Sequence, residues 1–169
     1  MCIRDRRHPE IARAVHAQQH EIGNHTFSHR RLCPRLGWQP NLLSADRIFD
    51  EFARTQDVLE HVVGVRPVIL RAPYGMRWFG LRAAQRRLGL LGVMWTVIGR
   101  DWELDASSVV DLVLRHARPG GIVCLHDGRD TRPDPDISAT LAAVRLLVPQ
   151  LKQRGYRFET VSELLQPDS

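Results

Sequence analysis

The chain lacks several features that mark membrane, disulfide-rich and zinc-ribbon proteins. No run of its 169 residues approaches the ~18 consecutive apolar residues of a membrane-spanning helix. The three cysteines, Cys2, Cys33 and Cys124, are widely spaced and form no Cys-x-x-Cys motif, which argues against a disulfide framework and against a cysteine zinc site. Cys124 lies within an apolar run, so we expect a buried thiol there.

Lysine is nearly absent, because Lys152 is the only lysine among 24 cationic residues. The arginines are scattered along the chain, and short clusters such as Arg30-Arg31 have no interleaved aromatic residues or nucleic-acid motif. We therefore attribute the formal charge of +5 to arginines on solvated surfaces, and we expect no nucleic-acid partner. Residues 1–7 look like a distinct, non-native N-terminal segment and are too charged to begin a signal peptide.

Helical and strand patterns alternate along the whole chain, with 43% hydrophobic residues and no repeat or linker. This alternation predicts an α/β fold with a parallel sheet. Thr160 and Glu163 have the spacing of a capping box for a final turn. The patterns predict helices at 9–18, 44–63, 77–88, 106–118 and 136–154, and strands at 20–24, 67–71, 90–98, 122–126 and 156–159.

Two histidines, His25 and His29, stand four residues apart directly after the first predicted strand. Two neutral imidazoles at this spacing can bind one metal ion such as zinc. The spacing alone is equally compatible with ordinary surface or hydrogen-bonded core histidines. No glutamate follows the first histidine, so the metalloprotease helix motif is not supported. Thr26 and Ser28 can fix a loop by side-chain hydrogen bonds to the backbone.

Polar or aromatic residues also follow the other apolar strands at their carboxyl ends. They are Arg-Ala-Pro-Tyr at 71–74, Asp-Trp at 101–102 and His-Asp at 126–127. In parallel α/β folds, ligands and catalytic groups collect at these strand ends. The sequence therefore predicts one active site built from several strand ends.

Together these motifs resemble the polysaccharide deacetylases with the NodB homology domain, carbohydrate esterase family 4. The matching motifs are His-[Ser/Thr]-x-x-His at 25–29, Arg-x-Pro-Tyr at 71–74 and a Leu-x-His type motif at 122–126, in the family's order. The resemblance extends from about His8 to Leu165. It implies metal-dependent removal of acetyl groups from N- or O-acetylated polysaccharides or oligosaccharides. It also implies that residues 8–169 form a partial, distorted (β/α) barrel that lacks its first strands.

The resemblance implies a metal site and a general acid. His25 and His29 would bind a divalent metal, zinc in the first place, with cobalt as an alternative. His126 would protonate the leaving amine or alkoxide, and Asp101 would hold its ring and favour its protonated form. Without the resemblance, His126 could be a hydrogen-bonded core residue, and Asp101 could cap the turn before Glu103.

The remaining implied roles concern the substrate and the catalytic base. Tyr74 would offer its backbone N–H to the developing oxyanion, and Trp102 would form a wall of the sugar cleft. Leu125 would line the pocket for the acetyl methyl group. Arg71 would orient the base through a charged hydrogen bond. Without the resemblance, Arg71 could instead form a surface ion pair, and Trp102 could simply pack over the apolar core.

The family's first motif, a strand that ends Thr-Phe-Asp-Asp-Gly-Pro, is missing. Its aspartates would supply the base and the third metal ligand, and no Asp-Asp pair occurs in this sequence. A second departure is Ile98, where many relatives have an aspartate. We therefore expect an N-terminally truncated reading of an active deacetylase, inactive by itself. The alternative is a degenerate, non-catalytic carbohydrate-binding module. The family's polymer substrates suggest secretion or the cell envelope.

Overall fold

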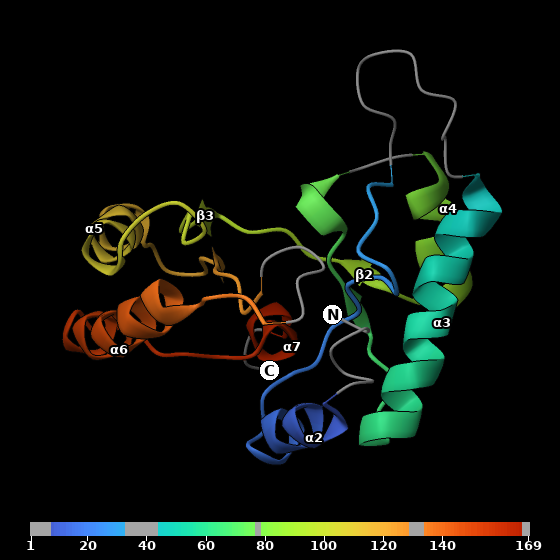
Figure 1. The fold of residues 1–169 in the computed structure, drawn as a ribbon, viewed down its shortest axis with the longest axis horizontal. Coiled ribbons are helices and arrows are strands. Elements are labelled where there is room, and N and C mark those ends of the chain that lie inside the picture. Colours follow the sequence, from blue (N-terminus) through green and yellow to red (C-terminus); the bar gives the residue numbers. More distant parts are fainter. Residues whose placement is uncertain (1–7, 33–43, 77–78, 129–133, 167–169) are drawn as a thin grey trace. The chain divides into compact units, whose positions relative to one another are not determined.

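The computed structural model describes residues 8–32, 44–76, 79–128 and 134–166 (Figure 1). The chain separates into two compact units, Met1–Val93 and Met94–Ser169. The distinct N-terminal segment predicted at residues 1–7 lies outside the described residues. Within the described ranges, no helix is both long enough and apolar enough to cross a membrane.

Within its described residues, the first unit contains the α-helices α2 (Pro9–Ala17), α3 (Ala45–Val63) and α4 (Phe79–Leu88). The Ser44 side chain caps α3 by accepting a hydrogen bond from the Arg47 N–H at 3.3 Å. Gly64 ends the same helix with a left-handed φ of 73°. The helix predicted at 44–63 is therefore confirmed at both ends.

The sheet of the first unit is short and parallel. It pairs β1 (Ile69–Leu70) with β2 (Leu91–Gly92) in the register Ile69↔Leu91 and Leu70↔Gly92. The strand predicted at 20–24 is wrong in its length, because only Asn24 joins the sheet, through a parallel bridge to Leu70. The chain leaves the sheet two residues later, where Thr26 has a left-handed φ of 66°.

The core of the first unit lies between α3, α4 and the sheet. Figure 1 shows α3 and α4 side by side, and the core includes side chains from both helices and from β1. Their backbones approach closely at Gly80, where an added Cβ would lie 2.8 Å from the Cα of Ala45. The buried members of this core are Leu32, Ile48, Phe52, Leu70, Ala72, Leu81, Ala84 and Leu90.

The second unit has the same kind of parallel pair, β3 (Val97–Ile98) with β4 (Val123–Cys124), in the register Val97↔Val123. The single strand predicted at 90–98 is therefore wrong. Its first half is β2, which pairs with β1, and its second half is β3, which pairs with β4. One continuous apolar run concealed this change of partner, because hydrophobicity does not say which strand a residue pairs with.

The described part of the second unit also contains the helices α5 (Ala106–His116), α6 (Ser138–Gln153) and α7 (Val161–Leu165). The capping box of Thr160 and Glu163 is present, as predicted. Residues 156–159 form no strand, contrary to expectation. The Tyr156 hydroxyl instead donates to the Ala117 carbonyl at 3.1 Å, which fixes this segment. The buried core residues are Val97, Val109, Val110, Val113, Ala143 and Leu147.

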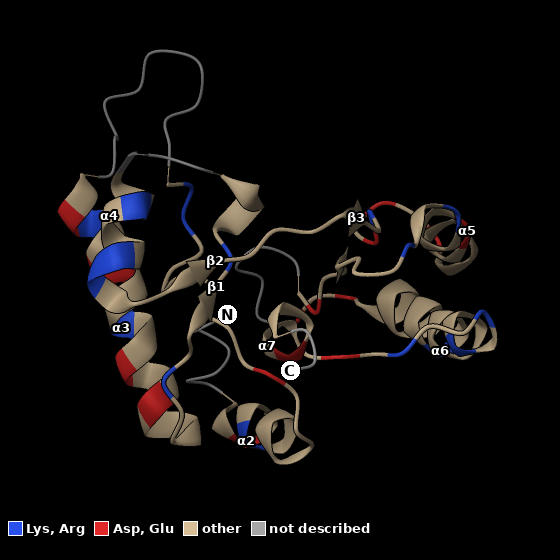
Figure 2. Ribbon diagram, turned by 180° about the vertical axis from the view of Figure 1, so that it is seen from behind, with Lys and Arg blue, Asp and Glu red and all other residues tan. Residues whose placement is uncertain are grey.

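Charged residues occur in both units, and in Figure 2 the ribbon of α3 is marked by both basic and acidic residues. Arg66, for example, lies 2.6 Å from Glu60 and 3.6 Å from Asp57, and all three side chains are largely solvent-exposed. Such exposed pairs contribute little to stability. The absence of a nucleic-acid partner stays a prediction. The buried Cys124 thiol is confirmed, with 5% exposure.

We predict that Gly80→Ala destabilises the first unit. The new methyl group would contact the α3 backbone at Ala45, so the two helices must separate at a cost of about 1–3 kcal/mol. Urea denaturation of the 169-residue chain measures this loss. The control is Arg82→Ala on the exposed face of α4, which should change the free energy of unfolding by less than about 0.5 kcal/mol. Equal effects of the two substitutions would contradict the close packing.

Candidate active site

Asn24 fixes the start of the histidine loop to helix α3. Its side chain is fully buried, and its Nδ2 donates to the Phe52 carbonyl and to Gln56 Oε1, both at 2.9 Å. Its Oδ1 accepts from the Thr26 N–H at 3.1 Å. All these polar atoms are therefore paired inside the core, where an unpaired one would be costly. The loop leaves the sheet in a fixed direction.

The loop itself is a tight turn held by Glu51 of α3. The Glu51 carboxylate accepts from the backbone N–H and from the hydroxyl of Ser28, each at 2.8 Å. The Thr26 Oγ1 accepts from the His29 N–H at 3.2 Å, and both residues have a left-handed φ, 66° and 56°. The expectation of loop-fixing side chains is thus confirmed for Thr26. For Ser28 the partner is a carboxylate on α3, which the sequence did not indicate.

The two predicted metal ligands lie together at this turn. The ring centroids of His25 and His29 are 5.0 Å apart. His25 Nδ1 lies 2.6 Å from the Arg71 carbonyl oxygen, which can only accept, so Nδ1 carries the proton and Nε2 keeps its lone pair. Metal-binding histidines are typically oriented by a partner of this kind.

His25 is neutral at neutral pH. Burial of the ring lowers its pKa to about 4, although the hydrogen bond to the Arg71 carbonyl opposes this change, and the nearby positive charge of His29, when protonated, lowers the pKa further. A metal ligand must be deprotonated, so this environment suits a ligand. The residues fit a divalent metal as two imidazole donors. Among the described residues, no group of three or more His, Cys, Asp or Glu side chains is placed to complete such a site.

Arg71 and Tyr74 lie beside the histidine pair, in the same unit. Tyr74 belongs to a short 3₁₀ turn, Pro73–Gly75, and has a left-handed φ of 58°. Its ring centroid is 5.1 Å from that of His29. The Arg71 side chain donates from Nε to the Val93 carbonyl at 3.4 Å. The roles predicted for these two residues toward the oxyanion and the base stay predictions.

The second unit brings His126 and Asp101 together, as predicted. His126 Nδ1 lies 2.8 Å from Asp101 Oδ1, and the backbone N–H of His126 donates to Asp101 Oδ2 at 2.8 Å. The hydroxyl of Thr140, on α6, donates to the same Oδ2 at 2.7 Å. Asp101 is buried and contacts His126 through both of its carboxylate oxygens. Thr140 was not predicted from the sequence, because it lies in a largely apolar helix.

The Asp101 carboxylate is stabilised in its charged form. Burial by itself raises the pKa, but hydrogen bonds from the His126 side chain, Thr140 and the His126 backbone outweigh it and lower the pKa to about 2. Asp101 is therefore ionised at every pH at which the protein would function.

The predicted substrate-binding residues of the second unit lie next to this pair. The rings of Trp102 and His126 meet edge to face, with centroids 5.0 Å apart and an angle of 87°. Trp102 is 44% exposed, so it does not serve merely as core cover. Leu125 is half-buried against the core of the second unit, and Ile98 is half-buried in β3. Lining of an acetyl pocket by Leu125 stays a prediction.

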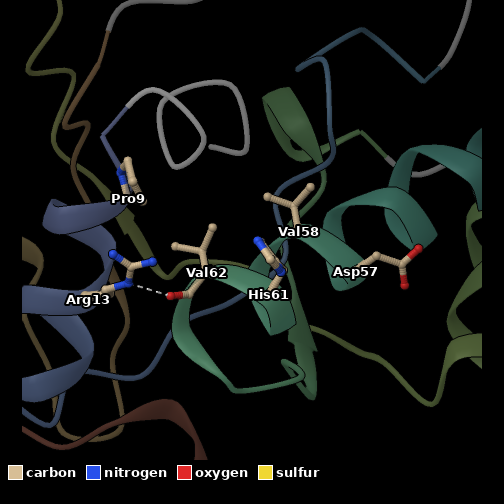
Figure 3. Close-up of a pocket in the computed structure, with 6 residues that line it drawn as sticks. All are labelled: Pro9, Arg13, Asp57, Val58, His61 and Val62. Atoms are coloured by element: carbon tan, nitrogen blue, oxygen red, sulfur yellow. Dashed lines mark hydrogen bonds between the residues drawn. The ribbon is translucent and has the colours of Figure 1, made fainter.

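The structure thus places the predicted residues in two groups, one in each unit. The first contains His25, His29, Arg71 and Tyr74, and the second contains Asp101, Trp102, Leu125 and His126. A separate hollow of about 460 Å³ between α2 and α3 holds none of them (Figure 3). It is lined by Pro9, Arg13, Asp57, Val58, His61 and Val62, and the Arg13 side chain donates to the Val62 carbonyl at 2.9 Å.

Comparison with known proteins assigns the family. The family model described as polysaccharide deacetylase matches residues 4–93. A chitooligosaccharide deacetylase of Azorhizobium caulinodans is 35% identical over 166 residues, which cover 90% of this chain and 72% of that protein. The chain belongs to the polysaccharide deacetylase family. A peptidoglycan-N-acetylglucosamine deacetylase of Bacillus cereus is 32% identical, over 97% of this chain and 72% of that protein.

Solved structures confirm the predicted fold class, a partial α/β fold of the NodB type. The Bc1960 peptidoglycan N-acetylglucosamine deacetylase superposes with a TM-score of 0.82 at 26% identity, over 95% of this chain and 70% of that chain. A family 4 pseudoenzyme of Bacillus anthracis gives a TM-score of 0.80 at 24% identity, over 96% of this chain. The chain spans only 52% of that protein's length, so this second match concerns the fold alone.

We predict that Asp101 makes stability depend on pH in acid. Because folding lowers its pKa from 3.8 to about 2, its stabilisation is complete above about pH 4 and is lost as the pH falls toward 2. The shift corresponds to roughly 2 kcal/mol. Urea denaturation at several pH values should show the stabilities of wild type and Asp101→Asn approaching each other by this amount. A constant difference over that range would contradict the assignment.

A second prediction concerns the Thr140 hydroxyl. Thr140→Val keeps the shape of the side chain but removes one donor to Asp101, so the Asp101 pKa should rise and the protein should lose about 1.5–3 kcal/mol. Thr140→Ser keeps the donor and should leave the pKa near its wild-type value. Carboxyl carbon NMR titration of Asp101 measures the difference. The same pKa in both variants would show that the hydroxyl does not stabilise the carboxylate.

Proposed function

We propose that this chain carries the metal-binding pair and the general acid of a hydrolase that deacetylates N- or O-acetylated polysaccharides or oligosaccharides. The observation that carries this proposal is the His25–His29 pair, in which His25 is held at Nδ1 by a backbone carbonyl and keeps Nε2 for a ligand. The names of the related proteins support the reaction class, since they are deacetylases of acetylated amino sugars.

In this proposal His25 and His29 hold a divalent metal, zinc or cobalt. Such an ion, when bound, polarises the acetyl carbonyl and lowers the pKa of a bound water. A catalytic zinc site usually has three protein ligands. The family's Asp-Asp pair, which would supply the third ligand and the base, occurs nowhere in the 169 residues. We therefore propose that this chain, tested alone, does not release acetate.

His126 is the proposed proton donor to the leaving group. Because Asp101 accepts the Nδ1 proton, Nε2 is the atom that can deliver a proton to the departing amine or alkoxide. Thr140 keeps the carboxylate in position from α6. His126 would thus act with a ring whose orientation and tautomer are both fixed.

The other predicted residues have proposed roles around the acetylated sugar. Exposed Trp102 offers an aromatic face or edge to a sugar ring, and Leu125 offers apolar contact to the acetyl methyl group. Tyr74 would present its backbone N–H to the oxyanion, in a turn whose left-handed φ fixes the peptide direction. Arg71 would orient the base through its guanidinium group.

A second candidate function is a non-catalytic carbohydrate-binding module. It is favoured by one observation, the lack of an Asp-Asp pair in the sequence. The exposed aromatic side chains of Tyr74 and Trp102 would serve sugar binding equally well without catalysis. The two functions differ in acetate release once the missing carboxylate is supplied from solution.

We predict that only the two proposed ligand histidines contribute to zinc affinity. His25→Ala and His29→Ala should each weaken zinc binding by at least about tenfold, because each removes one of two imidazole donors. His126→Ala should leave zinc affinity unchanged. Zinc titration followed by the histidine ring signals in NMR measures these affinities. Equal zinc binding in all three variants would refute the ligand assignment.

Acetate release then distinguishes the enzyme from the binding module. The assay uses the wild-type chain with zinc, an acetylated chitooligosaccharide and formate, because formate can replace the missing base as an external carboxylate. The enzyme function predicts formate-dependent acetate release that His126→Ala abolishes. Binding of the oligosaccharide without release at any formate concentration would favour the module.

A further inference from the structure

An arginine that no predicted role includes lies over the aromatic ring beside the histidine pair. The guanidinium carbon of Arg31 is 4.5 Å from the centroid of the Tyr74 ring. That ring is 5.1 Å from the His29 ring, centroid to centroid. Arg31 follows His29 by two residues and is exposed. A permanent positive charge is thus held one aromatic ring away from the proposed metal ligands.

The stacking leaves the hydrogen-bond donors of Arg31 available to a ligand. A guanidinium group that lies over a ring uses its face for the contact, while its N–H donors lie in its own plane. Among the described residues, Arg31 forms no ion pair. Glu51, the acidic residue of α3 that contacts this loop, already accepts both hydrogen bonds from Ser28. Arg31 therefore contacts the Tyr74 ring and has no carboxylate partner among the described residues.

We propose that Arg31, oriented by Tyr74, binds a carboxylate carried by the acetylated oligosaccharide. The site then prefers acetylated glycans with an acidic sugar over neutral ones. A guanidinium group binds a carboxylate with two parallel hydrogen bonds, which makes this contact selective for a planar anion. This inference rests on the proposed function, because it names the substrate class of the same site.

The alternative is that Arg31 only covers the exposed ring of Tyr74. Any long side chain could do that, since Arg and Met both bring apolar stem atoms to an aromatic surface. The two explanations differ in their dependence on charge. Arg31→Met keeps an apolar side chain over the Tyr74 ring but removes the positive charge. Arg31→Lys keeps the charge but cannot form the two parallel hydrogen bonds of a guanidinium group.

The experiment measures binding by the 169-residue chain, so it does not depend on turnover. The ligands are an N-acetylated disaccharide in which one sugar carries a carboxylate and the same disaccharide with that carboxylate reduced to an alcohol. By isothermal titration calorimetry at low salt, wild type should bind the charged form about fivefold or more tightly than the neutral form. Arg31→Met should bind both equally, and Arg31→Lys should show an intermediate preference.

Arg30→Gln is the matched control, because Arg30 is the adjacent exposed arginine and should leave the preference unchanged. Equal affinity of wild type for both disaccharides, or a preference that survives in Arg31→Met, would overturn the inference alone. If neither disaccharide bound, the proposed function and this inference would both be overturned. Binding of free acetate must also be measured, because acetate is a carboxylate that the proposed reaction releases. Arg31-dependent binding of acetate as tight as that of the acidic disaccharide would overturn the assignment to a sugar carboxylate.

Discussion

The buried side chain of Asn24 connects the sheet, the long helix and the histidine loop of the first unit. Its backbone bridges to β1, its amide nitrogen binds the Phe52 carbonyl and Gln56, and its amide oxygen binds the Thr26 N–H. Gln56 in turn donates to the Pro67 carbonyl, just before β1. Together with the hydrogen bonds from Ser28 to Glu51, this network fixes the position of His25 and His29 relative to the sheet.

The two units orient their histidines by the same means. Each ring is held at Nδ1 by an oxygen acceptor, the Arg71 carbonyl for His25 and the Asp101 carboxylate for His126. A neutral carbonyl does not compensate the burial of His25, whose pKa falls to about 4. The Asp101 carboxylate holds the ring of His126 at the same nitrogen. Both acceptors thus leave Nε2 of each ring for its proposed role, metal ligand in the first unit and proton donor in the second.

Local signals predicted the elements whose ends carry a specific residue. Ser44 and Gly64 delimit α3, and Thr160 with Glu163 begins α7, because caps are read from adjacent residues. The pairing of His126 with Asp101 was predicted from the family motifs. Glu51 and Thr140 were missed, since their partners lie 23 and 39 residues away in the sequence and a polar residue in a helix shows no such partner. The division of residues 90–98 into two strands was missed for the same reason.

The acceptor that orients His25 belongs to the main chain of residue 71 and not to a side chain. Mutation of Arg71 can therefore alter its guanidinium chemistry while the tautomer of the neighbouring histidine is preserved. A related protein with another side chain at position 71 could therefore still hold the ring of His25 in the same tautomer. A one-residue slip of β1 would have the opposite effect, because it would turn the carbonyl away and release the ring even if every side chain stayed the same.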